Sequence, residues 1–278
     1  GTSFLHHPGL VTADLMSWPG FDNAWCTSGN DQVVGTSFAT PLVSGVVALM
    51  LQVQPSLTWR DVQHILAVSA SQVDVLDGDW VINGGGYHTS RRYGFGLLNA
   101  GLAVHVAKSW VPVSQPQQVC STASVRGNQV LPDPGSVLIR RNMRGCRQIK
   151  CVEHVILRVT LRHSRRGDIA IQLTSPAGTT SLLAASRPGD ESADGLRDFP
   201  LLSLQFWGEN ATGDWILQVQ DVREGFEGVL ESYALDIYGA SSCVAHGSLD
   251  WDRNSVPSCG PTLSTVMTCL VMLVYILL

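Results

Sequence analysis

Ser37 combines a residue type and a local setting that suit nucleophilic catalysis. Gly35 precedes it and allows a tight turn, and an almost wholly apolar run follows over residues 38–53. Such a run is typical of a helix buried on all sides, and a serine at its start lies where the helix dipole favours developing negative charge. The small side chain of Ala39 permits close packing behind the hydroxyl. The residues therefore predict a serine nucleophile, and the competing interpretation is an ordinary helix N-cap.

Two further helices are expected to support the helix that carries Ser37. Thr58 followed three residues later by Asp61 resembles a capping box, which predicts a helix over residues 59–70. Residues 94–110 begin with glycines and continue with apolar side chains at helical spacing. Together these elements predict a first unit over residues 1–110.

The spacing of apolar residues changes from helical to alternating, and this change marks a second unit over residues 120–240. Residues 111–119 contain two prolines and three glutamines and are expected to be a linker. Beyond them apolar side chains alternate with polar ones, as at Val155, Leu157, Val159 and Leu161. Several short strands with one apolar face predict an all-β antiparallel sandwich of the jelly-roll type. A polar connector, residues 241–260, follows.

The last 18 residues, 261–278, carry no charge and become strongly apolar from Val266 onward. They predict a hydrophobic helix that is slightly short for a membrane span. A transmembrane segment is the first interpretation and the signal for a glycolipid anchor is the second. A buried soluble helix is the third.

Composition excludes some classes of function and favours a secreted location. The length of 278 residues favours two globular units, and the formal net charge of −5 excludes nucleic acid as the main partner. No cysteine lies at a spacing that indicates a metal site. Asn210, Ala211 and Thr212 form an acceptor pattern for N-glycosylation, which is consistent with an oxidising lumenal compartment.

The serine lies in a longer motif. The run from Gly35 to Gly45, with sequence GTSFATPLVSG, resembles the serine signature of the subtilisin superfamily. Gly1-Thr2-Ser3-Phe4 repeats its first residues without the apolar run, so Ser3 is interpreted as a loop residue. Residues 57–64 and 93–101 resemble the furin and kexin relatives, the proprotein convertases. Residues 165–171, 174–179 and 213–215 resemble the P domain of that family. The resemblance covers residues 35–240 and implies an α/β subtilisin-like part followed by a P domain.

The resemblance also implies a function. It implies a calcium-dependent serine endopeptidase of the Golgi or the cell-surface membrane that cleaves precursor proteins after paired basic residues. In the family the catalytic aspartate and histidine, the oxyanion asparagine and the calcium ligands precede the serine. His6 and His7 do not lie in such a motif, and His64 is expected on a scaffold helix, facing solvent or core. This chain alone is therefore expected to be inactive.

The P domain is expected to pack against the peptidase part and stabilise it. The alternative function is a non-catalytic secretory protein that binds partners through its P domain.

Basic residues gather between Arg140 and Arg166. Nine Arg or Lys residues lie there, and Glu153 is the only acid among them. A surface that binds heparin or anionic lipid is one interpretation. The favoured one is an outward strand face that pairs with the acidic stretch of residues 190–224. Residues 166–168 read Arg-Gly-Asp, and a structural turn is favoured over an integrin-binding loop.

The resemblance implies one disulfide, between Cys120 and Cys146. Cys243 and Cys259 are a candidate pair that would close the connector, and Cys26 is expected to pair with a cysteine upstream. Cys151 has no expected partner. Cys269, in the apolar tail, is interpreted as an inert thiol rather than a palmitoylation site.

Overall fold

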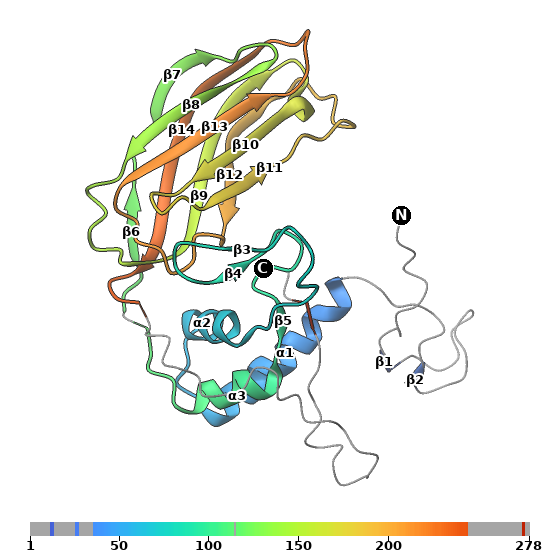
Figure 1. Cartoon of the computed structure of the whole chain (residues 1–278), viewed down its shortest axis with the longest axis vertical. Coiled ribbons are helices and arrows are strands. Elements are labelled where there is room, and N and C mark those ends of the chain that lie inside the picture. Colours follow the sequence, from blue (N-terminus) through green and yellow to red (C-terminus); the bar gives the residue numbers. More distant parts are fainter. Residues whose placement is uncertain (1–11, 14–25, 28–35, 114, 244–273, 276–278) are drawn as a thin grey trace.

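The computed structural model describes residues 12–13, 26–27, 36–113, 115–243 and 274–275. Figure 1 shows a helical part at one end and a β-sandwich at the other, joined along a seam where the loop around β3 and β4 meets the sandwich. Near the N-terminus β1 (Thr12–Ala13) pairs with β2 (Cys26–Thr27).

Three helices make up most of the first part: α1 (Thr36–Val53), α2 (Trp59–Ser69) and α3 (Ala100–Lys108). The capping box predicted at the start of α2 is confirmed, because the Thr58 side chain accepts from Asp61 N and the Asp61 carboxylate accepts from Thr58 N. Asn99 caps α3 with its side chain alone, which accepts from Leu102 N at 2.9 Å. The apolar faces of the three helices share one core with Trp110 and Val113.

The expectation that α1 is buried on all sides is wrong for the described residues. Val46 and Met50 are buried in the core with α3, whereas Leu49, Leu51 and Val53 are 37–41% exposed. A helix that is apolar all round needs cover on every side, and the described residues cover one face of α1.

Short strands connect the helices. They are β3 (Val81–Ile82), β4 (His88–Thr89) and β5 (Leu97–Leu98), and β5 pairs with β15 (Val274–Tyr275). Within the described part no parallel sheet accompanies α1 to α3. The rest of the apolar tail, expected to be a helix, lies outside the described residues. No helix among the described residues is both long and apolar enough to cross a membrane.

The second part is a sandwich of two antiparallel sheets. One sheet has the order β11-β10-β13-β8 and the other β12-β9-β14-β6, with β7 also on β14. The strands are β6 (Gln118–Ser121), β7 (Val125–Val130), β8 (Gly135–Asn142), β9 (Cys151–His163), β10 (Ile169–Thr174), β11 (Thr180–Ala184), β12 (Leu196–Ser203), β13 (Asp214–Asp221) and β14 (Gly228–Ala240). The alternation predicted along β9 is confirmed, because Val155, Leu157, Val159 and Leu161 are each 1% exposed. Strand β6 begins at Gln118, inside the expected linker.

Two disulfides join cysteines within the part of the chain that the structure describes. Cys120 bonds to Cys146, the pair that the resemblance implies. Cys243 bonds to Cys151, so its expected pairing with Cys259 is wrong. The register of β14 on β9 explains this, because it sets Ala240 opposite Cys151 and brings the chain beyond β14 to that cysteine. Cys259 and Cys269 lie outside the described residues.

Candidate functional site

Ser37 is the second residue of α1, in its first turn. The turn is followed by side-chain hydrogen bonds along the helix, from Thr40 Oγ1 to Thr36 O and from Ser44 Oγ to Thr40 O. The backbone thus lies at a helix N-terminus, where free N–H groups and the dipole favour an anion. The Ser37 side chain, residues 28–35 and both His6 and His7 lie outside the described residues.

His64 lies in the core, one of its two expected positions. It is 1% exposed, and its Nε2 lies 3.1 Å from Glu153 Oε1 on β9. Its ring meets that of Trp207 edge to face with 4.7 Å between centroids. Its ring is therefore held in the seam between the helical part and the sandwich.

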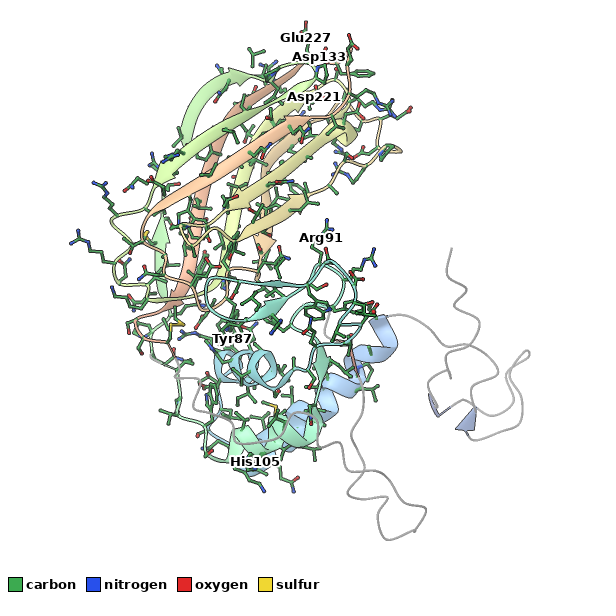
Figure 2. The ribbon with its side chains drawn as sticks, in the orientation of Figure 1. Tyr87, Arg91, His105, Asp133, Asp221 and Glu227 are labelled. Carbon is green, nitrogen blue, oxygen red and sulfur yellow. A yellow bond between two sulfur atoms is a disulfide. The ribbon has the colours of Figure 1, made fainter. Side chains whose placement is uncertain are left out.

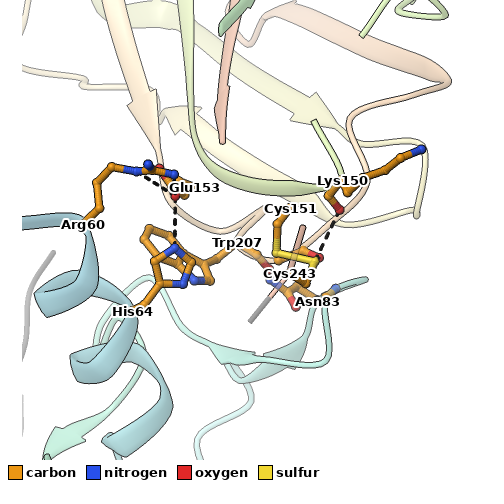
Figure 3. The surroundings of a disulfide bond; sticks show 10 residues. Arg60, His64, Asn83, Lys150, Cys151, Glu153, Trp207 and Cys243 are labelled. Carbon is orange, nitrogen blue, oxygen red and sulfur yellow. Dashed lines mark hydrogen bonds and ion pairs between the residues drawn. A yellow bond between two sulfur atoms is a disulfide. The ribbon is translucent and has the colours of Figure 1, made fainter. Parts of the chain in front are cut away.

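Glu153 is the centre of that seam. Its carboxylate accepts from Arg60 Nε at 3.0 and 2.9 Å and also from Arg60 Nη2, and Gln117 Nε2 donates to it at 2.6 Å. Glu153 is fully buried and Arg60 is 1% exposed. Figure 3 shows the Arg60 and His64 side chains of α2 directed at the Glu153 side chain. Glu153 thus holds α2 against the sandwich. In the sequence it is the only acid among the nine basic residues between Arg140 and Arg166.

The hydrogen bonds at Glu153 outweigh the cost of burying a charge. Burial alone would raise its pKa, but the bonds from His64, Arg60 and Gln117 lower the pKa from 4.5 to about 2. The carboxylate is therefore ionised at every pH that a protein meets in the cell. A buried charge with this many partners fixes one docking geometry, because any other leaves it unpaired.

A close backbone approach forms the second contact of the seam. Asn83 Nδ2 donates to Gln205 O and to Trp207 O, both at 2.9 Å, and Gly84 N donates to Glu209 Oε1 at 3.0 Å. A Cβ built on Gly85 would lie 2.3 Å from Trp207 O, so only glycine allows this approach. The glycine-rich stretch before β4 therefore serves the docking of the sandwich.

Aromatic rings fill the space behind this contact. Tyr87, Phe95 and Trp207 form one small core, in which Phe95 and Trp207 meet edge to face. Burial raises the pKa of Tyr87 to about 12, against the opposing effect of a hydrogen bond with Trp207. Figure 2 shows Tyr87 at the seam, whereas Asp133, Asp221 and Glu227 lie at the far end of the sandwich.

Asp61 connects the helices to the segment that enters the sandwich. Besides its part in the capping box, its Oδ1 accepts from Trp110 Nε1 at 2.9 Å and from Val113 N at 2.8 Å. Burial would raise its pKa, but these bonds and those from Thr58 lower it. One ionised side chain thus fixes the start of α2 and the exit from α3.

The basic run divides into two halves. Five of its members form ion pairs with acids: Arg140 with Asp214, Arg158 with Asp198 and Asp236, Arg162 with Glu231, Arg165 with Asp168 and Glu191, and Arg166 with Asp190. The interpretation of a strand face paired with the acidic stretch of residues 190–224 is confirmed for Arg140 on β8 and Arg158 on β9. Arg162 pairs outside that stretch, and Arg165 and Arg166 lie beyond the end of β9. The other four form no ion pair within the described part of the chain: Arg141, Arg144, Arg147 and Lys150.

The Arg-Gly-Asp turn is structural. It forms the short 3-10 helix η1 (Arg166–Asp168), and Asp168 is 2% exposed. A Cβ on Gly167 would lie 2.3 Å from Arg187 O. The sequence is therefore built into the sandwich rather than displayed to a receptor.

Neither a metal cluster nor a complete catalytic group is assembled by the described residues. Within them no three His, Cys, Asp or Glu side chains could hold a metal ion together, so the calcium ligands expected upstream find no substitute there. Asn210 is exposed, in the loop before β13, and its Oδ1 accepts from Thr212 N at 2.8 Å.

In comparisons with known proteins, the helical part and the sandwich match two different family models. The proprotein convertase P-domain model matches residues 152–237, and the subtilase family model matches residues 16–96. Human proprotein convertase subtilisin/kexin type 4 is 40% identical over 240 residues, which make up 84% of this chain and 30% of that protein. Furin from Rattus norvegicus is 37% identical over 242 residues, 84% of this chain and 28% of that protein.

Solved structures add the fold. A serine protease of Aeromonas sobria superposes with a TM-score of 0.64 at 27% identity, over 78% of this chain and 46% of that chain. This chain spans about 30% of the length of its human type 4 relative. Because a subtilase part and a P domain match in the same order in one chain, it belongs to the proprotein convertase branch of the subtilase family, with part of a subtilase domain followed by a P domain.

Proposed function

We propose that the protein containing this chain is a serine endopeptidase that cleaves secretory precursors after paired basic residues, with Ser37 as nucleophile. The observation that carries the proposal is the serine motif in the first turn of α1, in a chain whose P domain is docked on α2 through a buried ionic seam. Paired basic residues as the cleavage site come from the family resemblance alone.

The chemistry is acyl transfer in two halves. Ser37 Oγ attacks the scissile carbonyl carbon while its proton passes to a histidine base, and the carbonyl oxygen becomes an oxyanion. The C–N bond then breaks as the histidine returns the proton to the leaving amine. Water repeats the sequence on the acyl-enzyme and releases the acid. The described residues supply neither the base nor its aspartate, so we propose that this chain alone is inactive.

We propose that the P domain acts as a structural support for the peptidase part. The units are residues 1–110 and 120–240, with residues 111–119 as the linker, 241–260 as the connector and 261–278 as a membrane anchor. Gln117 of the linker donates to Glu153, so the linker itself takes part in the seam. The support rests on the Glu153 cluster and on the contact of Asn83 and Gly84 with residues 205–209.

Three further properties belong to the same proposal. Calcium would be held by residues upstream of Ser37. Asn210 would carry an N-linked glycan, since it is exposed within the acceptor pattern. The protein would act in the lumen of the secretory pathway or at the cell surface, held by residues 261–278.

Turnover of a fluorogenic dibasic peptide by the complete protein tests the nucleophile. Ser37→Ala should lower kcat by about 10⁴-fold or more, because acyl-enzyme formation is lost. Ser3→Ala is a matched control, since Ser3 lies in the same Gly-Thr-Ser-Phe sequence. Equal turnover by both variants would show that the nucleophile is another residue. The alternative of a purely binding protein requires no turnover even by the unaltered protein.

A further inference from the structure

The loop between β8 and β9 is a ribbon with a repeat of three residues. Two successive turns are closed by hydrogen bonds of 3.0 Å, from Cys146 N to Met143 O and from Ile149 N to Cys146 O. Met143, Cys146 and Ile149, whose backbones form these turns, are 0–4% exposed. Each is followed directly by an exposed basic residue, in the order Arg144, Arg147 and Lys150. We call residues 143–150 the basic ribbon.

The ribbon is held at both ends. Met143 N donates to Gly213 O at 2.7 Å, Ala211 N to Ile149 O at 3.4 Å and Lys150 N to Ala240 O at 2.9 Å. The disulfide from Cys146 to Cys120 holds its middle. In Figure 3 the Lys150 side chain extends away from the neighbouring Cys151–Cys243 bond. The backbone that carries the three cations is therefore ordered before any ligand arrives, which lowers the entropy cost of binding.

The charge of the ribbon is not balanced locally. Residues 141–152 contain no acid, and the three exposed cations form no ion pair within the described residues. Asp214, whose pKa is lowered by Asn142 first and then by Arg140 and Arg144, is already hydrogen-bonded to Asn142 and Arg140. The ribbon therefore presents net positive charge to solvent, in contrast to the paired arginines of β9.

We propose that the basic ribbon binds a sulfated polysaccharide of the heparan sulfate class. Such a chain is a linear polyanion with repeated sulfate groups, which matches cations repeated every three residues on a fixed backbone. An anionic lipid surface fits less well, because the apolar side chains of the ribbon are all buried and none is free to insert. The proposal concerns where the protein is held and does not depend on its peptidase activity.

Binding of the full chain to immobilised heparin over a salt series tests the proposal. The ribbon variant replaces all three exposed cations with glutamine: Arg144→Gln, Arg147→Gln and Lys150→Gln. Its affinity should fall at least about 10-fold near 0.15 M salt, and the slope of log Kd against log salt should fall by about 2 to 3, one for each lost ionic contact. Replacing the arginines with lysine instead should preserve binding.

A matched control removes the same charge from arginines that already have acidic partners. It carries Arg91→Gln, Arg92→Gln and Arg162→Gln, whose side chains are 56–68% exposed. The control should keep the original salt slope. Thermal unfolding of both variants checks that they fold.

Three results would overturn the proposal. The first is an equal loss of binding in the ribbon variant and the control, which would show a general charge effect. The second is undiminished binding to chemically desulfated heparin. The third is tighter binding to vesicles of phosphatidylserine and phosphatidylcholine than to heparin, which would assign the ribbon to a lipid surface.

Discussion

The two parts of the chain bury their apolar side chains in different ways. In the P domain each apolar row of β9 meets another row from the facing sheet, and Leu157 is 1% exposed. In the peptidase part α1 is as apolar as a core helix, yet Leu51 is 38% exposed. The P domain thus completes its core within the described residues, whereas the helices depend on contacts outside their own part, of which the Glu153 seam is one. The difference supports the proposal that the P domain is the support and that the peptidase part is stabilised by it.

The disulfides should have the largest effect, and on the P domain. Replacing Cys151 and Cys243 with alanine removes a crosslink over 92 residues, which the chain-entropy model values at about 4 to 5 kcal/mol. The Cys120–Cys146 pair spans 26 residues and should cost about 3 to 4 kcal/mol. Denaturant unfolding of the two double variants measures both. The reverse order would show that strain or residual structure, not loop length, decides.

Glu153→Gln should destabilise the helices more than the sandwich. Breaking a buried ion pair on one side leaves Arg60 without its counter-charge and costs about 3 to 5 kcal/mol. Hydrogen exchange should accelerate in α2 and α3 and stay slow in β9 and β14. Glu231→Gln removes a partly exposed partner of Arg162 and should cost less than about 1 kcal/mol. Equal acceleration in both parts would contradict a self-sufficient P domain.

Acid should release the seam in a defined range. The pKa of Glu153 is lowered in the folded chain, so its contribution is complete above pH 4.5 and is lost as the pH falls towards 2. The difference between the pKa values of 4.5 and about 2 corresponds to a stabilisation of the folded chain on the order of 3 kcal/mol. The melting temperature of the parent should therefore decrease as the pH is lowered below 4.5. That of Glu153→Gln should decrease less over the same pH range. Parallel curves would mean that other carboxylates govern acid unfolding.

The smallest effect is expected at an exposed apolar residue of α1. Leu51→Ala should change the stability of the 278-residue chain by less than about 0.5 kcal/mol, whereas Leu157→Ala should cost about 2 to 5 kcal/mol. Denaturant midpoints give both values. Leu51→Ala should also be measured in the complete protein, since a cost above about 2 kcal/mol there would show that an upstream segment covers α1.

Local patterns predicted the elements well. The capping box of Thr58 and Asp61 fixed the start of α2, and the alternation in β9 gave its buried face, because both depend on residues close in sequence. The serine motif placed Ser37 at the start of its helix for the same reason.

Contacts distant in sequence were the ones missed. Glu153 stood out as the lone acid of a basic run, but its partner Arg60 lies 93 residues away and no local signal joins them. Cys151 found its partner only through the register of β14 on β9. The exposure of α1 was missed because an apolar run indicates that a helix needs apolar contacts on every side. It does not indicate whether the described residues provide those contacts.

The Cys151–Cys243 bond also decides how the fold responds to mechanical force. Tension on the chain beyond Cys243 would otherwise peel β14 away from its neighbours, breaking its ladder one hydrogen bond at a time from Ala240. The bond passes the pull directly to β9, in the middle of the same sheet. While the bond is intact, the ends of β14 and β9 cannot separate, so the ladder between these two strands is protected against being unzipped from this end.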